Sequence, residues 1–293
     1  MIGGSRTIAY LFGRLYKMLF LWREGYRIRD KLLLIPYAII QTLMGLFRLG
    51  GLLALIPGWY RIYWITVPPF NVILKNRFGL FHCRGGTDDL QVLCEYYETA
   101  ESSYLQTFHD GVIIDIGAHV GRFSILVANE MRRRDSKDGK VVAIEPHPSN
   151  YAALEQNVLL NHLTNVTALN LACWSENREM ELYFDPHGRT TNHSVVDQST
   201  RGNITVRCAT LDSIVQESDL RDIRAIKIDV EGASAEVLEG AAGTLQSNDY
   251  PPIIVEGLGE EFDKCKIILE RYGYTLYPMA PVFNRNYLAV KDD

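Results

Sequence analysis

The fold is decided by the stretch Val112-Ile113-Ile114-Asp115-Ile116-Gly117-Ala118-His119-Val120-Gly121-Arg122-Phe123-Ser124. Three apolar residues lead into Asp115, two glycines follow at a spacing of four, and apolar residues at helical spacing begin at Phe123. In a parallel sheet covered on both faces, a strand is a continuous apolar run, and ligands bind beyond its carboxyl end. The stretch therefore predicts a buried strand, a glycine turn and a helix beside a ligand site.

The spacing of this turn, D-x-G-x-x-x-G, differs from the G-x-G-x-x-G that holds a dinucleotide pyrophosphate at a helix N-terminus. We expect Gly117 to let the backbone approach a ligand closely and Gly121 to let the helix pack tightly on the strand. The carboxylate of Asp115 repels a pyrophosphate but suits a ligand with a cationic amino group and no phosphate. S-adenosylmethionine is such a ligand, although an ordinary strand-to-helix turn has the same pattern.

A second strand is predicted from Lys140 to Glu145, and the helix breaker Pro146 follows it. In nucleotide-binding sheets, an acidic residue at the tip of the second strand accepts hydrogen bonds from the ribose hydroxyls. Glu145 has that place, and its distance along the chain from the glycine turn fits a β-α-β unit. Together the two stretches indicate a nucleoside-binding crevice.

Four stretches resemble the FkbM family of S-adenosylmethionine-dependent methyltransferases, over roughly residues 85 to 280. They are residues 115–121, residues 143–146 with Asn150, the helix end at residues 157–161 and, above all, Ile226-Lys227-Ile228-Asp229-Val230-Glu231-Gly232. Two positions depart from the family pattern. His119 stands where the family usually has Asn, and Ser234 stands where a Glu often follows.

The resemblance implies an α/β fold, a Rossmann-like class I methyltransferase sheet that is mostly parallel and has an antiparallel terminal strand. Residues 274–279 and 286–290 are expected to supply the terminal hairpin, and residues 166–173 the third strand, whose tip reads the adenine edge. The implied cofactor is S-adenosylmethionine. The residues expected to bind it are Asp115, Gly117, Ala118, Gly121, Glu145, Pro146, Ala172 and Cys173.

The fourth strand carries the candidate catalytic residues Lys227, Asp229 and Glu231, which the two-residue period places on one side. Charges on one face of a central strand are costly to bury without partners, which favours a functional interpretation. Glu256 ends the fifth strand, so Asp229, Glu231 and Glu256 are expected to converge near the transferred methyl and contact the acceptor. We expect Lys227 and the sulfonium to offset their repulsion and predict no metal; a divalent cation is the alternative.

Composition limits the class of protein. The chain has 293 residues, 47% of them hydrophobic and 22% charged, as is ordinary for a globular protein. A net charge of −5 argues against general nucleic-acid binding. The five cysteines are far apart and form no C-x-x-C, and no H-E-x-x-H occurs, which favours a reducing compartment and no structural metal.

The first 66 residues are predicted to be a basic and apolar helical extension, and residues 67–293 the methyltransferase domain. Residues 1–31 hold seven basic residues against Glu24 and Asp30, with apolar residues at helical spacing, as in a membrane-surface helix. The apolar runs 32–47 and 49–57 are shorter than the roughly 20 residues that span a bilayer. A monotopic anchor keeps the enzyme on the cytoplasmic side, with its cofactor; the alternatives are a helix packed on the catalytic domain and a helical cap over the active site.

The polar stretch of residues 186–202 is predicted to be a lobe of an inserted hairpin that meets the acceptor, with His193 as a candidate contact. A surface loop without such a role is the alternative. We expect O-methylation of a hydroxyl of a sugar, glycolipid or other natural product. The alternatives are a membrane-tethered cofactor-binding protein without catalysis and an NAD-dependent oxidoreductase.

Overall fold

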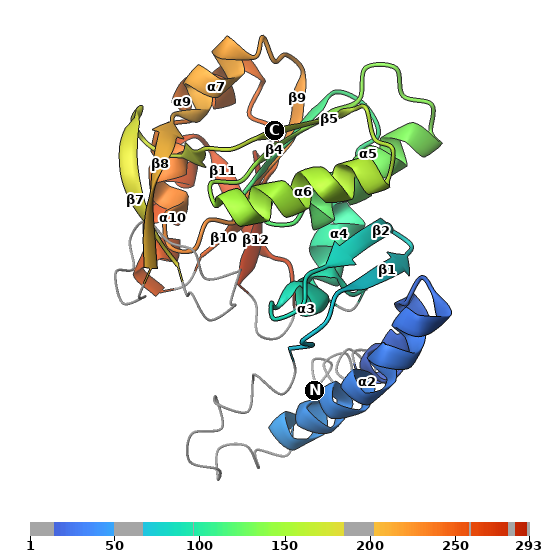
Figure 1. Ribbon diagram of the computed structural model, residues 1–293. Helices are drawn as coiled ribbons and strands as arrows, with labels where there is room; N and C mark the ends of the chain where they lie inside the picture. The colour runs from blue at the N-terminus through green and yellow to red at the C-terminus, as the bar shows by residue number, and fades with distance from the viewer. Residues whose placement is uncertain are drawn as a thin grey trace, which may run out of the picture. The chain divides into compact units, whose positions relative to one another are not determined.

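The computed structural model describes residues 15–49, 67–95, 97–184, 202–257, 259–280 and 285–291 (Figure 1). The chain divides into two compact units, Met1–Thr99 and Ala100–Asp293. His193 lies outside the described residues.

The first unit is built on an antiparallel hairpin, β1 (Val72–Asn76) and β2 (Gly79–Cys83), in the register Val72 to Cys83. Its helices include η1 (Leu21–Glu24), α2 (Ile28–Leu49) and α3 (Asp89–Leu93). The Glu24 carboxylate joins these elements, because it accepts hydrogen bonds from Asn76 Nδ2 at 3.1 Å and from the Glu95 backbone N–H at 3.3 Å. None of the described helices is long and apolar enough to cross a membrane.

The second unit contains a seven-stranded sheet in the order β11-β12-β10-β9-β3-β4-β5. β3, β4, β5, β9 and β10 run parallel, and β12 pairs antiparallel with both β10 and β11, so the predicted antiparallel terminal strand is confirmed. The bounds of the strands are β3 Val112–Ile116, β4 Lys140–Ile144, β5 Val166–Leu169, β9 Ile223–Ile228, β10 Ile253–Glu256, β11 Tyr274–Pro278 and β12 Asn286–Lys291.

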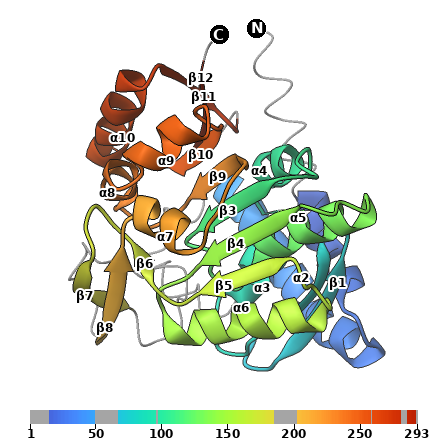
Figure 2. The same ribbon diagram turned by 90° about the horizontal axis from the view of Figure 1, so that it is seen from above.

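Helices cover both faces of this sheet (Figure 2). One face carries α4 (Thr99–Leu105), α5 (Arg122–Arg133) and α6 (Pro148–Leu160). The other carries α7 (Leu211–Glu217), α8 (Ser234–Glu239), α9 (Ala242–Ser247) and α10 (Gly259–Arg271). Because both faces are covered, all five residues of β3 are buried, as the apolar run of that strand predicts.

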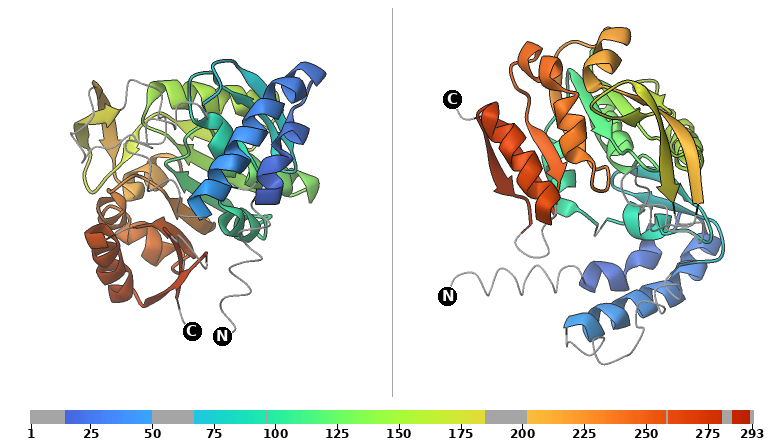
Figure 3. Two further views of the ribbon diagram at one scale, coloured as in Figure 1. Left: turned by 90° about the horizontal axis from the view of Figure 1, so that it is seen from below. Right: turned by 90° about the vertical axis from the view of Figure 1, so that its left-hand side faces the viewer.

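A separate three-stranded sheet, β6-β8-β7, is formed by β6 (Ala172–Cys173), β7 (Arg178–Phe184) and β8 (Gly202–Ala209). The β7–β8 hairpin projects from one side of the second unit (Figure 3). The expectation of one third strand through Cys173 is therefore wrong, because β5 ends at Leu169 and β6 pairs with β8. Asn170 causes the break: its Nδ2 donates to the carbonyl oxygens of Glu145 at 2.8 Å and Pro146 at 3.0 Å.

The chain after β9 forms two short helices, because α8 ends before Gly240 and α9 begins at Ala242. A Cβ added to Gly240 would overlap the backbone carbonyl oxygen of Trp174. The glycine thus allows the helix break to pack directly against the chain that leaves β6.

We predict that Gly240→Ala destabilises the protein by about 3 kcal/mol, since the overlap is with backbone atoms and overpacking of this kind costs roughly 1–3 kcal/mol or more. Gly232→Ala is the matched control. A Cβ there meets no atom within 4 Å, and only the positive φ of 85° opposes it, at about 1–2 kcal/mol. Urea unfolding measures both, and equal losses would contradict the steric explanation.

Candidate active site

The first glycine turn joins three strands of the sheet. The backbone N–H groups of Gly117 and Ala118 both donate to the carbonyl oxygen of Ile144 at the end of β4, at 2.9 and 3.0 Å. Gly117 has a φ of 79°, and a Cβ there would overlap the carbonyl oxygen of Asp229. Gly117 thus lets the chain that follows β9 approach closely, and the predicted approach to a ligand stays a prediction.

Gly121 serves the packing of two helices. It precedes α5 with a φ of 88°, and a Cβ there would lie 2.5 Å from Leu154 Cδ1 on α6. The expectation was close packing of the helix on the strand, whereas the nearest atom belongs to the neighbouring helix. The glycine is needed for its backbone conformation and for this contact alike.

Asp115 is buried beneath the turn, with 2% of its surface exposed. Its Oδ2 accepts a hydrogen bond from Ser124 Oγ at 2.6 Å, and Lys227 Nζ lies 3.9 Å from its Oδ1. Burial raises the pKa of Asp115, and the Lys227 ammonium and the Ser124 hydrogen bonds only partly offset it. Binding of the cofactor by Asp115 stays a prediction. The hydrogen bond from Ser124 to Asp115 was not predicted, although Ser124 lies in the stretch that decides the fold.

Lys227 lies on β9 directly opposite Asp115 on β3 and is 2% exposed. Its Nζ is 2.7 Å from Asp229 Oδ2 and 4.7 Å from the centroid of the Phe123 ring. The ammonium is thus enclosed by two carboxylates and an aromatic face, an arrangement that stabilises a buried charge. A catalytic role for Lys227 stays a prediction.

Asp229 and Glu256 are brought together because β9 and β10 are parallel neighbours, with Ile228 opposite Val255. The backbone N–H of Asp229 donates to Ile116 O at 3.0 Å, which fixes the carboxylate at the end of β3. Burial acts to raise the pKa of Asp229, but the Lys227 ammonium, its hydrogen bond, a hydrogen bond with the Glu256 carboxyl and the charge of His119 together lower it below its usual range. The Asp229 carboxyl is therefore ionised at neutral pH, and 27% of its side chain is exposed.

Glu231 lies in a turn beyond the end of β9. The strand ends at Ile228, and Glu231 and Gly232 both have positive φ angles, 38° and 85°. The two-residue alternation expected for Lys227, Asp229 and Glu231 therefore does not extend to Glu231. A catalytic role for Glu231 stays a prediction.

Glu145 connects the first two turns of the sheet. Its Oε2 accepts the backbone N–H of His119 at 2.9 Å, and its Oε1 accepts the backbone N–H of His147 at 3.0 Å. Oε1 also accepts a hydrogen bond from Asn150 Nδ2 at 3.4 Å. Binding of the ribose hydroxyls by Glu145 stays a prediction. Asn170, which was not predicted from the sequence, donates hydrogen bonds from its Nδ2 to the carbonyl oxygens of Glu145 and Pro146.

Ala172 and Cys173 are buried in β6. Burial raises the pKa of the Cys173 thiol well above its usual range, so the side chain is an uncharged part of the core. The nearby hairpin contacts the second turn, because the ring of Phe184, at the end of β7, meets the ring of His147 edge-on at 5.1 Å between centroids. Contacts of Ala172 and Cys173 with the adenine ring stay a prediction.

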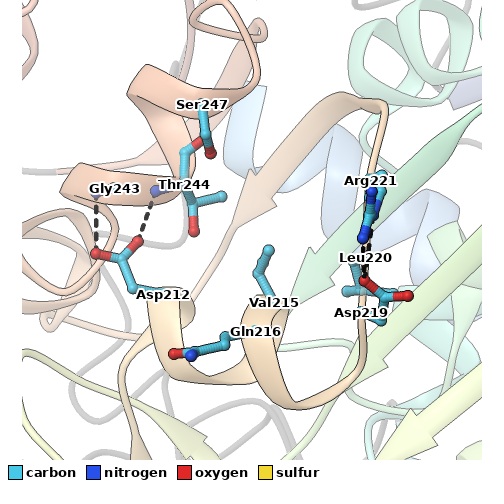
Figure 4. A pocket seen from close by; sticks show the side chains of 9 residues that line it. All are labelled: Asp212, Val215, Gln216, Asp219, Leu220, Arg221, Gly243, Thr244 and Ser247. Atoms are coloured by element: carbon cyan, nitrogen blue, oxygen red, sulfur yellow. Dashed lines mark hydrogen bonds and ion pairs between the residues drawn. The ribbon is translucent and has the colours of Figure 1, made fainter.

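A groove of about 330 Å³ lies elsewhere, between α7 and α9 (Figure 4). Asp212 closes one side, where its carboxylate accepts the backbone N–H groups of Gly243 at 2.9 Å and Thr244 at 2.7 Å. Arg221 lies on the other side, just before β9 begins. The groove is thus at the amino end of β9, whereas Asp229 and Glu256 are at the carboxyl ends of their strands.

The comparison with known families agrees with this arrangement. The sequence profile described as the Methyltransferase FkbM domain matches residues 115–276, more than half of the chain, from the first turn to β11. The chain belongs to the FkbM methyltransferase family. Its cofactor is accordingly S-adenosylmethionine, and the NAD-dependent oxidoreductase alternative is excluded.

Individual relatives are distant. The hexuronic acid methyltransferase AglP of Haloferax volcanii is 24% identical over 64% of this chain and 69% of its own. Methyltransferase sdnD of Sordaria araneosa is 27% identical over 44% of this chain and 59% of its own. A crystal structure of a methyltransferase FkbM from Methylobacillus flagellatus superposes with a TM-score of 0.46 and 14% identity, over 96% of this chain and 60% of that one.

We predict that Glu145→Ala weakens S-adenosylmethionine binding by roughly ten- to a hundredfold, since hydrogen bonds to a charged group contribute about 1.5–3 kcal/mol. Glu155→Ala is the control, because Glu155 is an exposed carboxylate on α6 whose hydrogen bond is with Tyr151. Isothermal titration calorimetry measures both. Unchanged affinity in the Glu145 variant would remove this residue from the cofactor site.

We predict that Lys227→Met destabilises the protein by about 3–5 kcal/mol at neutral pH, because the buried carboxylate of Asp115 and the half-buried carboxylate of Asp229 lose their counter-charge. In the parent protein the pKa of Asp229 is lower in the folded state than in the unfolded state. The stability that this difference contributes is fully present above the unfolded-state pKa and is lost as the pH falls through the folded-state pKa. Without the ammonium the carboxylates take up protons more readily, so the deficit shrinks as pH falls toward 5. The control Lys266→Met removes an exposed lysine 3.7 Å from Glu270, and exposed pairs are worth about 0–1 kcal/mol.

Proposed function

We propose that this methyltransferase moves the methyl group of S-adenosylmethionine to a hydroxyl oxygen of a sugar, either free or carried on a glycolipid. The observation that carries the proposal is the ionised carboxylate of Asp229, fixed at the end of β9 and hydrogen-bonded to Glu256. An acceptor that loses a proton as it is methylated needs such a group. The similarity to a hexuronic acid methyltransferase supports a sugar as the class of acceptor.

The reaction places few demands on the protein. The sulfonium already makes the methyl carbon electrophilic, so the oxygen-carbon bond forms as the carbon-sulfur bond breaks, and the cofactor leaves as a neutral thioether. The acceptor hydroxyl gives its proton to Asp229, which is the base in this proposal. Most of the rate enhancement then comes from holding the oxygen, carbon and sulfur in line.

Lys227 and Glu256 act on Asp229 from two sides. The ammonium lies 2.7 Å from Asp229 Oδ2 and keeps the carboxylate ionised, while Glu256 fixes its orientation. Arg285 Nη1, 3.7 Å from Glu256 Oε1, adds a positive charge on the exposed side of this pair.

We also propose that the enzyme works on the cytoplasmic side of a membrane. S-adenosylmethionine is a cytosolic cofactor, and a glycolipid acceptor is held at a membrane surface. The excess of basic residues over acidic ones in residues 1–31 supports this location, since basic segments are attracted to anionic headgroups.

We predict that Asp229→Asn lowers turnover at least about a hundredfold, which is the lower range of general-base contributions, and that it leaves S-adenosylmethionine affinity nearly unchanged. Asp219→Asn is the control, because Asp219 is 81% exposed and pairs only with Arg221 among the described residues. The assay transfers radiolabelled methyl to uronic acid glycosides, neutral glycosides and a glycolipid extract.

Two outcomes would contradict the proposal. Normal turnover of the Asp229→Asn enzyme on an accepted sugar would show that Asp229 is not the base. Label that appears only on nitrogen or carbon of other acceptors would remove the O-methyl assignment. Addition of a chelator is expected to leave activity unchanged, and activity that a chelator abolishes and magnesium restores would favour the divalent cation instead.

A further inference from the structure

Helix α2 has an exposed face made only of large apolar residues. They recur at helical spacing and lie within roughly 80° of arc at 100° per residue. They are Ile28, Leu32, Ile35, Ile39, Leu43 and Leu46, with exposed fractions of 79, 62, 39, 49, 48 and 49%. No charged residue occurs between Leu32 and Leu46, so this stripe has no polar interruption.

The opposite face of the same helix is buried. Leu34 is fully buried, Ala38 is 1% exposed and Gln41 is 7% exposed. An amphipathic helix of a soluble protein normally has one apolar stripe, and that stripe faces the core. Helix α2 has two, and only one of them is covered by the residues that the structure describes.

The exposed charge around this face has one sign. Residues 15–46 contain five basic side chains, four exposed and one half-buried: Lys17, Arg23, Arg27, Arg29 and Lys31. The two acids of this segment are turned inward. Asp30 is buried and accepts the backbone N–H of Arg27 at 3.1 Å, and Glu24 is half-buried against Asn76.

We propose that the outer face of α2 lies in the surface of an anionic lipid bilayer, with the helix parallel to the membrane plane. The six apolar side chains enter the boundary between headgroups and acyl chains, and the basic residues at the start of the helix bind the anionic headgroups. The proposal rests on the location at a membrane proposed above and does not depend on the methylation chemistry. It specifies the surface of the protein and the class of lipid.

The charges favour a bilayer over a second copy of the chain. A second copy would present the same stripe with the same basic residues, and no exposed acid in residues 15–46 is there to pair with them. Anionic lipids supply the missing negative charge beside the basic residues at the start of the stripe. The apolar face from Ile28 to Leu46 extends about 27 Å at 1.5 Å per residue, long enough to hold the helix flat.

The test measures binding of the full chain to vesicles by cosedimentation. One set of vesicles is phosphatidylcholine alone, and the other contains about a third phosphatidylserine. The test variant is Leu32→Glu with Ile39→Glu. The matched control is Leu159→Glu with Ile267→Glu, on α6 and α10, whose parent side chains are 74 and 54% exposed. Both pairs replace two exposed apolar residues and add two negative charges, and glutamate favours a helix.

We expect the parent chain and the control to bind phosphatidylserine vesicles alike, and the α2 variant to bind at least about tenfold more weakly, since each buried Leu or Ile contributes about 1.5 kcal/mol or more. Urea unfolding checks that the α2 variant is folded. Its activity on a soluble sugar acceptor should equal that of the parent.

Three results would overturn the inference. If the α2 variant binds like the parent, the membrane location stands but another surface mediates it. If the parent chain binds neither vesicle, both the location and the lipid-facing role of α2 are wrong, whatever the methylation assay gives. If light scattering shows that the parent chain is a dimer and the α2 variant is a monomer, and the two bind vesicles equally, the face is an interface between copies of the chain.

Discussion

The ion pair between Lys227 and Asp229 is the interaction on which the rest of the site depends. A lysine that is 2% exposed is costly unless carboxylates enclose it, and the register of β3 and β9 supplies Asp115 opposite it. Asp229, just past the end of β9, completes the enclosure at 2.7 Å. The charges that are expensive to bury therefore also fix the partly exposed carboxylate of Asp229 at the carboxyl edge of the sheet.

The glycine turn after β3 makes this arrangement possible. Gly117 has no side chain, so the backbone of Asp229 passes directly over it and donates to Ile116 at 3.0 Å. On the other side of the same turn, His119 donates its backbone N–H to Glu145 at 2.9 Å. Glu145, which is predicted to bind the ribose, and Asp229 are thus attached to the same few residues.

Much of this architecture is predictable from the sequence, because it depends on patterns of few residues. The apolar run before Asp115, the acid at the end of β4 and the terminal hairpin all gave the correct strands. The errors arose where side chains far apart in the sequence meet. Where β5 ends, the side chain of Asn170 donates to the carbonyl oxygens of Glu145 and Pro146. The chain turns at Glu231, so this residue does not follow the two-residue alternation of Lys227 and Asp229. Ser124 is visible in the sequence, but its hydrogen bond to Asp115 follows only from the turn between them.

The central claim is that Lys227 keeps Asp229 ionised at the edge of the sheet, ready to accept a proton. A carboxyl-carbon NMR titration of Asp229 in the full chain, with S-adenosylhomocysteine bound, tests it most directly. The account predicts that Asp229 remains ionised down to a pH below the usual range of an aspartate, and that its titration midpoint moves upward in Lys227→Met. A midpoint near neutral pH in the parent protein, or one that Lys227→Met leaves unchanged, would contradict it.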